Sequence, residues 1–183
     1  APKLDVSEKI IEISREDAIK DSDRIKFENE NIKGSISLKG GIIDDLIFKN
    51  YTETLDGQNN ITLLSPKKFS QGYYVETGWV SSSKNIDLPN SKTIWKVDGN
   101  NKLAPNQSVT LTWNNNQGIV FEKIIQIDEK FLFSIDQKIK NKSNKSYDFY
   151  SYGQIIRNKS PDVTNFYILH EGLIGVFDDQ LVE

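Results

Sequence analysis

Apolar and polar residues alternate most clearly between Leu111 and Arg157, and the rest of the chain is interpreted around this stretch. Three long segments alternate here, and the two connections between them are short and rich in turn-forming residues. Because neighbouring side chains of a strand point to opposite faces, this alternation gives a strand a core side and a solvent side. The stretch therefore predicts consecutive antiparallel strands at the centre of the fold.

The first two segments each have one apolar face. In the first segment this face is interrupted only by Lys123 and consists of Ile119, Phe121, Ile125 and Ile127. The tight connection 128–130 leads into the second segment, whose apolar face consists of Phe131, Phe133, Ile135 and Ile139. Both patterns are typical of half-buried strands joined as a hairpin.

The third segment, Tyr147 to Arg157, has apolar side chains on both faces. We therefore expect it to lie centrally in a layered sheet, with Tyr150 and Tyr152 as packing residues. The connection before it, 141–146, is the polar run NKSNKS, whose Asn and Ser side chains can close turns through backbone hydrogen bonds. The expected result is a hairpin between the second and third segments.

Shorter runs surround this stretch. Strands are expected at 10–13, 24–30, 32–39, 42–48, 61–64, 94–97, 108–113 and in two pieces of 165–182, with a surface loop at 81–93. Gly40-Gly41 predicts a hairpin turn; the alternative, a phosphate-binding loop, requires a helix after the glycines, and IIDDLIF does not predict one. With about a dozen strands and no helical period, we expect an all-β domain of two packed antiparallel sheets spanning residues 1–183.

Composition narrows the class of protein. The chain has 183 residues, a formal net charge of −3 and 37% hydrophobic residues, which suits one soluble domain and argues against a basic nucleic-acid binder. Cysteine is absent, which excludes disulfides, thiolate nucleophiles and Cys-ligated metals. No apolar run reaches the roughly 20 residues of a membrane span, and no signal-peptide pattern is present. Because methionine is also absent, we interpret the chain as a segment of a longer protein.

Two places hold candidate chemistry. One aromatic run contains Tyr73, Tyr74 and Trp79, which either fill a core or line a binding face. His170, the only histidine, stands beside Glu171, but neighbours along a strand point to opposite faces, so the pair is not expected to catalyse acid–base chemistry. The sequence also lacks a calcium-loop motif and a G-x-S-x-G motif. We expect no catalytic residue, metal or cofactor, and nominate Tyr73, Tyr74, Trp79, His170 and Glu171 as a partner or ligand surface.

Several sequence phrases occur in a characteristic order. They are GSISLKGGIIDDLIFKNY from Gly34, YYVETGWV from Tyr73, LTWNNNQGIVFEKIIQIDEKFLFSIDQKIKN from Leu111, YGQIIR from Tyr152 and LHEGLIGVFDDQLVE from Leu169. Together they resemble the large periplasmic domain of the bacterial YidC membrane protein insertase family, in its alphaproteobacterial form. The order and spacing match over nearly the whole chain.

The resemblance implies a β-supersandwich, similar to galactose mutarotase and carbohydrate-binding domains, that stands in the periplasm between the first two transmembrane helices of an inner-membrane protein. In the family, insertion is carried by the membrane core, which lies outside this chain, so Arg157 is not the arginine of the family's membrane groove. The periplasmic domain is expected to be an accessory module that contacts the SecDF subunits of the Sec translocon and serves nascent membrane proteins. Further strands are expected after Glu183, so the sandwich is expected to be truncated there, with exposed edges and apolar faces.

Three functions are therefore compared. The leading hypothesis is a non-enzymatic, periplasmic interaction domain of a membrane protein insertase. The alternative is a carbohydrate-binding or aldose-epimerase-like module of the same fold, because Tyr73 and Trp79 could stack on sugars. An epimerase would need a His acid opposed by a Glu base across a cleft, which His170 beside Glu171 does not provide. The third hypothesis is a structural spacer without a partner.

Overall fold

The computed structural model describes residues 13–99, 101–159 and 174–182. These residues form one short helix and thirteen strands. The elements are α1 (Arg15–Ile19), β1 (Arg24–Glu28), β2 (Ile32–Ser37), β3 (Ile42–Thr52), β4 (Asn60–Leu64), β5 (Tyr73–Ser81), β6 (Lys96–Asp98), β7 (Lys102–Leu103), β8 (Ser108–Asn114), β9 (Ile119–Ile127), β10 (Phe133–Asn141), β11 (Phe149–Arg157), β12 (Gly175–Phe177) and β13 (Gln180–Val182).

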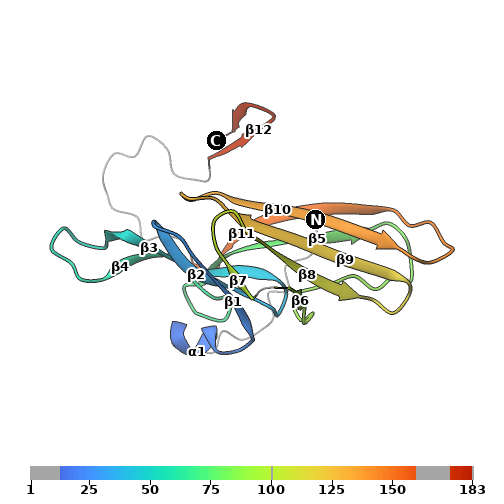
Figure 1. Cartoon of the computed structure of the whole chain (residues 1–183), viewed down its shortest axis with the longest axis horizontal. Coiled ribbons are helices and arrows are strands. Elements are labelled where there is room, and N and C mark those ends of the chain that lie inside the picture. Colours follow the sequence, from blue (N-terminus) through green and yellow to red (C-terminus); the bar gives the residue numbers. More distant parts are fainter. Residues whose placement is uncertain (1–12, 100, 160–173, 183) are drawn as a thin grey trace.

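A seven-stranded sheet forms one layer of the fold. Its strand order is β11-β5-β3-β2-β1-β7, and β4 pairs with β3 to form a hairpin at one end of the molecule (Figure 1). All its pairs are antiparallel except that of β1 with β7. The predicted turn between β2 and β3 is confirmed, since Gly40 and Gly41 have φ of 79° and 62°, a region that glycine adopts without strain.

A four-stranded sheet forms the second layer, in the order β10-β9-β8-β6. Strands β8, β9 and β10 follow one another along the chain and pair antiparallel, as their alternation predicts. The apolar face of β9 is buried: Ile119, Phe121 and Ile125 are at most 1% exposed. The predicted hairpin between the first two segments is therefore confirmed.

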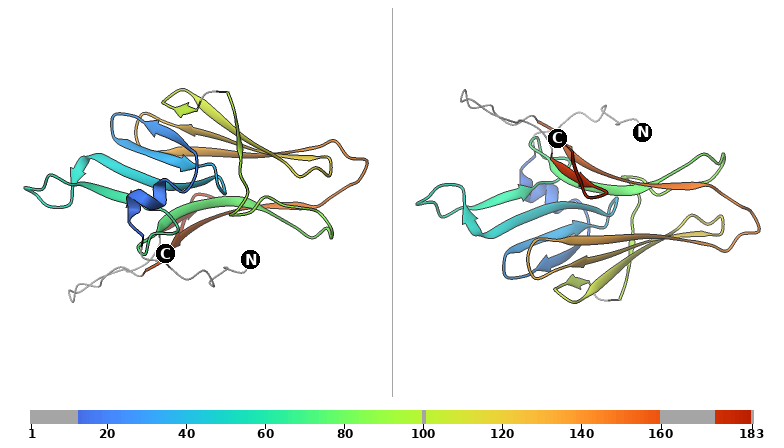
Figure 2. Two further views of the ribbon diagram at one scale, coloured as in Figure 1. Left: turned by 90° about the horizontal axis from the view of Figure 1, so that it is seen from below. Right: turned by 90° about the horizontal axis from the view of Figure 1, so that it is seen from above.

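The two layers enclose one apolar core (Figure 2). Its aromatic centre is Phe121, whose ring centroid lies 5.1 Å from that of Trp79, 5.8 Å from that of Trp113 and 5.7 Å from that of Phe149. Tilted and edge-to-face pairs at these distances are favourable arrangements of aromatic rings. The predicted all-β sandwich of two packed sheets is confirmed.

Strand β11 is not in the predicted place. Among the described strands it pairs with β5 alone and lies at the edge of the seven-stranded sheet, whereas β10 lies at the edge of the other sheet. The expected hairpin between β10 and β11 is therefore wrong, because the connection crosses from one sheet to the other. A turn contact within it does form, since Ser143 N donates to Asn141 Oδ1 at 2.9 Å, and Lys142 N ties it to the β8–β9 connection by donating to Gly118 O at 2.7 Å.

The two tyrosines of β11 also differ from expectation. Tyr150 is 59% exposed, so its assignment as a packing residue is wrong. Tyr152 is partly buried and lies against Gly78 of β5, where a Cβ atom would stand 2.7 Å from the tyrosine oxygen. Both rings lie on the face of β11 opposite Phe149, which packs against the core, and on that face the ring of Tyr150 is open to solvent.

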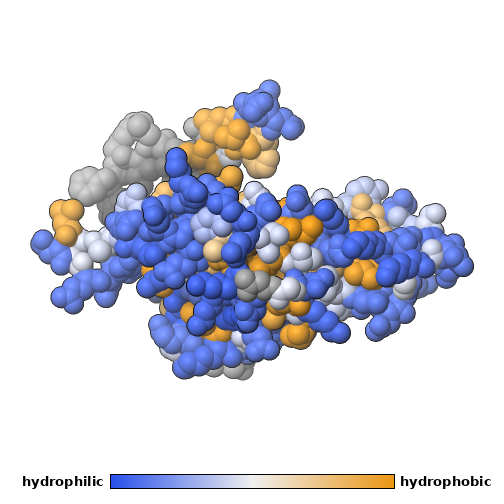
Figure 3. Space-filling model, in the orientation of Figure 1, coloured by the Kyte–Doolittle hydropathy of each residue, from blue (hydrophilic) through white to orange (hydrophobic). Residues whose placement is uncertain are grey.

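The ends of the described chain add two features. The polar run before β1 contains α1, which the sequence interpretation missed, and Ser14 caps this helix by accepting a hydrogen bond from Asp17 N. Hairpin β12–β13 carries exposed apolar side chains, seen in orange at the top of Figure 3: Val176, Phe177, Leu181 and Val182. Strands are also expected at both ends of the chain. Residues 10–12 of the expected strand 10–13, and the first of the two strands expected in 165–182, lie outside the described residues.

Candidate functional site

The nominated aromatic residues do not share one surface. Side chains alternate along β5, so Tyr73 and Trp79 point toward the core while Tyr74 points to the other face of the sheet. Trp79 is 5% exposed and Tyr74 is 2% exposed, so the nomination of these two as a contact surface is corrected: both are packing residues. Tyr73 is partly buried, and the Arg157 guanidinium carbon lies 5.3 Å from its ring centroid.

His170 and Glu171 lie outside the described residues, and their nomination stays a prediction. Within the described ranges, no group of three His, Cys, Asp or Glu side chains is arranged to hold a metal ion. The buried charged groups and the pocket described next lie at sites that the sequence interpretation did not nominate.

A β-bulge in β3 creates the first of these sites. Ile43 pairs with Ile36 and Asp45 pairs with Ser35, so Asp44 is an extra residue without a partner on β2. A bulge brings two successive side chains toward one face, which regular pleating would separate. Both carboxylates thereby reach arginines on the outer face of the seven-stranded sheet.

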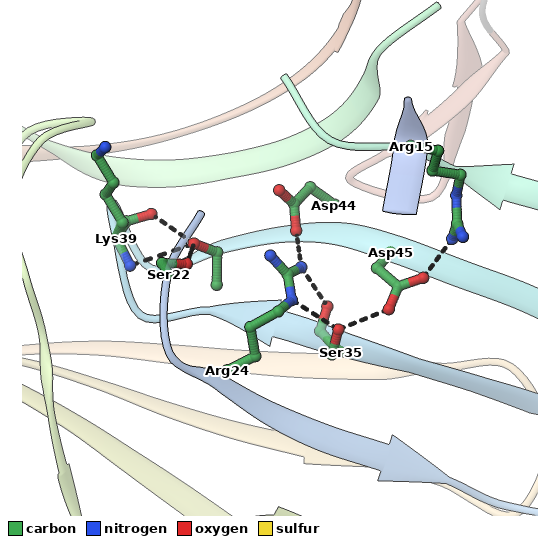
Figure 4. Close-up of polar contacts among 8 residues, drawn as sticks. Arg15, Ser22, Arg24, Ser35, Lys39, Asp44 and Asp45 are labelled. Atoms are coloured by element: carbon green, nitrogen blue, oxygen red, sulfur yellow. Dashed lines mark hydrogen bonds and ion pairs between the residues drawn. The ribbon is translucent and has the colours of Figure 1, made fainter. Parts of the chain in front are cut away.

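These carboxylates belong to a continuous polar network under α1 (Figure 4). Arg24 of β1 forms an ion pair with Asp44, and its Nε donates to Ser35 Oγ at 2.7 Å. The Ser35 hydroxyl in turn donates to Asp45 Oδ2 at 2.5 Å, and Arg15 of α1 forms an ion pair with Asp45. The network therefore ties α1 to three strands of the sheet.

Burial shapes the electrostatics of this network. The Arg24 and Asp44 side chains are 9% and 8% exposed. Desolvation raises the pKa of the Asp44 carboxyl above its ordinary value, against the opposing influence of Arg24. The ion pair thus costs solvation energy that its mutual attraction only partly offsets.

A cavity of about 370 Å³ opens beside this network, and we call it the α1 pocket. Five cationic side chains and two carboxylates line it: Arg24, Lys39, Lys67, Lys68, Lys92, Asp21 and Asp44. They come from the turn after α1, from the stretch β1 to β3, from the β4–β5 connection and from the loop before β6, and Ala18 of α1 completes this side of the lining. The pocket is large enough for a small ligand.

Asp21 is the counter-ion of two of these lysines. Its carboxylate lies 2.7 Å from Lys68 Nζ and 3.1 Å from Lys39 Nζ. The hydrogen bond from Lys68 is the largest cause that lowers the pKa of Asp21. In the described part of the chain, Lys67 and Lys92 form no ion pair.

The inner face of the sheet holds a different charge. Lys123, the interruption in the apolar face of β9, is 1% exposed, and its Nζ donates to Thr77 O at 2.7 Å and Gly41 O at 3.2 Å. The Nζ also lies 5.0 Å from the centroid of the Trp95 ring. Desolvation lowers the pKa of Lys123 to about 8, and the Glu76 carboxylate opposes this shift.

Two signals in the sequence mark these sites. Consecutive aspartates inside the apolar run IIDDLIF cannot both face solvent in a regular strand, and a lysine stands within an otherwise apolar face. The pocket itself leaves no spacing signature, because its lining comes from segments far apart in the sequence.

Comparison with known proteins identifies the family. The profile described as the YidC periplasmic domain matches residues 24–183. The chain is 56% identical over 182 residues to "Membrane protein insertase YidC" of Pelagibacter ubique (strain HTCC1062), and 44% identical over 165 residues to the protein of that name from Methylorubrum extorquens (strain PA1). These relatives give the sugar-directed alternative no support.

The match covers nearly all of this chain but a minor part of each relative. It spans 100% of the chain and 33% of the Pelagibacter protein, and 90% of the chain and 26% of the Methylorubrum protein. In the described residues, no helix has the length and apolar character to cross a membrane. The resemblance seen in the sequence phrases is confirmed, and the chain belongs to the YidC periplasmic domain family.

Proposed function

We propose that this chain is the periplasmic interaction domain of a membrane protein insertase held in the inner membrane. The observation that carries the proposal is the family match over residues 24–183, together with relatives named as membrane protein insertases. In this role residues 1–183 act as one β-sandwich unit that presents surfaces to partners. The whole protein's insertion of membrane segments lies with parts of the relatives outside this match.

The role is non-enzymatic. The buried ionisable groups of the described chain are engaged in structural contacts: Asp44 with Arg24, and Lys123 with backbone carbonyls. A general acid or base needs access to a substrate proton, which these contacts do not offer.

The proposed partners are the SecDF subunits and nascent membrane proteins. Two surfaces are the candidates for contact. One consists of the nominated residues that are not corrected above, Tyr73, His170 and Glu171, of which Tyr73 is partly buried. The other is hairpin β12–β13, where Phe177 is 67% exposed and Val176 is 68% exposed. Contiguous exposed apolar side chains are typical of interaction sites.

Site-specific photocrosslinking in the full-length protein tests these contacts. A crosslinking amino acid replaces Phe177 in one variant and Tyr73 in another, and Lys138, exposed on β10, is the control position. The expected result is capture of SecDF or of a nascent membrane protein from Phe177 or Tyr73, and none from Lys138. Capture at background level from both test positions would instead favour the spacer hypothesis.

A further inference from the structure

The α1 pocket concentrates positive charge on an acidic protein. The chain has a formal net charge of −3, yet cationic side chains outnumber carboxylates by five to two in the lining. One of each is already neutralised at the buried end, where Arg24 pairs with Asp44. The remaining four cations are lysines, which face a single carboxylate, that of Asp21.

The two lysines without a counter-ion come from different walls. Lys67 belongs to the β4–β5 connection and Lys92 to the loop before β6, and within the described chain neither is ion-paired. The polar floor adds hydroxyl groups, since Ser22 and Ser37 also line the pocket and their Oγ atoms lie 2.7 Å apart. The Ser37 hydroxyl also donates to Lys39 O at 3.0 Å, so these hydroxyl groups are already paired, and the lysine ammonium groups supply the charged donors that a compact anion needs.

We propose that the α1 pocket binds a phosphate group, carried by a small phosphate ester or by the headgroup of a phospholipid. Lys67 and Lys92 contact its oxygens, and Lys39 and Lys68 turn toward it from their shared partner Asp21. A phosphate suits the site better than a single carboxylate, because the four lysines exceed what one negative charge would neutralise. The cavity volume of about 370 Å³ admits a glycerophosphate group.

Asp21 sets the affinity of this pocket. Its carboxylate holds Lys39 and Lys68 in place, but it also repels an incoming anion. The proposal therefore requires opposite effects from the two kinds of lining charge: removal of lysine charge weakens phosphate binding, and removal of the Asp21 charge strengthens it. Loss of folding cannot mimic the second effect.

Titration of the chain with glycerol 1-phosphate at low salt, followed by amide NMR, measures this binding. The expected result is saturable shifts of the amide signals of Lys67, Lys68, Ser91 and Lys92. The variant Lys67→Gln/Lys92→Gln should bind at least about tenfold more weakly, since two charge-assisted contacts are lost. The matched control, Lys138→Gln/Lys142→Gln, removes the same charge from exposed positions in and after β10 and should bind like the wild type.

The variant Asp21→Asn tests the opposite effect, in which loss of a negative charge strengthens phosphate binding. It should bind glycerol 1-phosphate about threefold more tightly, because Lys39 and Lys68 lose their competing partner. Absence of saturable shifts in the wild type, equal weakening in the control variant, or weaker binding by Asp21→Asn would each overturn the proposal.

Vesicles distinguish the two sources of phosphate. Sedimentation with phosphatidylglycerol vesicles, but not with phosphatidylcholine vesicles, and its loss in Lys67→Gln/Lys92→Gln would identify an anionic lipid headgroup. Binding of glycerol 1-phosphate without vesicle binding would identify a free phosphate ester and would equally support the pocket. These measurements need no Sec component, so they succeed or fail independently of the proposed insertase role.

Discussion

The two faces of the seven-stranded sheet accommodate buried charge differently. On the outer face, arginines and aspartates alternate in one network, Arg15–Asp45–Ser35–Arg24–Asp44, beneath α1. On the inner face, Lys123 reaches across from β9 of the other sheet, donates to the backbone carbonyl oxygens of Gly41 and Thr77 and lies near the Trp95 ring. The outer face uses opposite charges, whereas the inner face uses dipoles and a π system.

This difference has an energetic meaning. An ion pair becomes a liability when one partner is removed, because the other charge stays buried without compensation. A lysine held by carbonyl oxygens can instead lose its proton, become neutral and stay hydrogen-bonded. The outer network should therefore respond most to mutation of a partner, and Lys123 most to pH.

Phe121→Ala has the largest expected effect, because it tests the apolar frame around Lys123. Phe121 is fully buried and its ring packs on those of Trp79, Trp113 and Phe149. The free energy of unfolding, from urea denaturation, should fall by about 3–5 kcal/mol. Phe131→Ala, at a ring 46% exposed, is the control and should cost less than about 1 kcal/mol. Equal losses would mean that the two sheets do not share a packed core.

Arg24→Ala tests the outer network. It leaves Asp44 buried without its cationic partner, and the free energy of unfolding at pH 7 should fall by about 3 kcal/mol. The pKa of Asp44 is already raised by desolvation, and loss of Arg24 should raise it further. A raised carboxyl pKa means that the folded state holds a proton more strongly than the unfolded state, so stability falls as pH rises.

The loss in Arg24→Ala should therefore be smaller at pH 5 than at pH 8. The double variant Arg24→Met/Asp44→Asn removes both charges and should recover at least about half of the loss. A deficit that does not change with pH, or a double variant as unstable as the single one, would contradict the assignment of Asp44 as the stranded charge.

The next largest effect is the pH dependence that Lys123 gives to the free energy of unfolding. Because its folded pKa is about 8 and its ordinary value is 10.5, the unfolded state binds more protons between these values, and stability should rise with pH. From pH 8 to 10 the wild type should gain about 2 kcal/mol relative to Lys123→Met. The pKa values of Tyr74 and Tyr152 are raised to about 12, so these tyrosines lower the stability as pH rises, but only near and above pH 10. They do so equally in the wild type and in Lys123→Met. Parallel pH profiles would show that Lys123 is not desolvated.

Alternation predicted which faces are apolar but not which strands are neighbours. It placed β8, β9 and β10 correctly, because short connections leave consecutive strands few other partners. It failed for β11. Phe149 faces the core and Tyr152 lies over Gly78 on the other face, so this edge strand has apolar side chains on both faces, as a central strand does. The five residues of α1 are too few to show a helical period.

The sites were less predictable for a related reason. The aromatic residues of β5 attracted attention by their type, but Tyr74 and Trp79 are explained by packing. The outer network depends on a register shift at Asp44, and a bulge changes facing without changing composition. The α1 pocket depends on loops that meet only in the folded chain, and no local pattern records that meeting.

The smallest expected effect separates the two tyrosines of β11. Tyr150 is 59% exposed, so Tyr150→Ser should change the free energy of unfolding by less than about 0.5 kcal/mol. Tyr152→Ser should cost more, about 1–2 kcal/mol, because Tyr152 covers Gly78 and its hydroxyl lies 3.1 Å from Glu76 Oε1. Urea denaturation of both variants in parallel measures the difference. If Tyr150→Ser were the more harmful change, the outer face of β11 would be covered at Tyr150 and not at Tyr152.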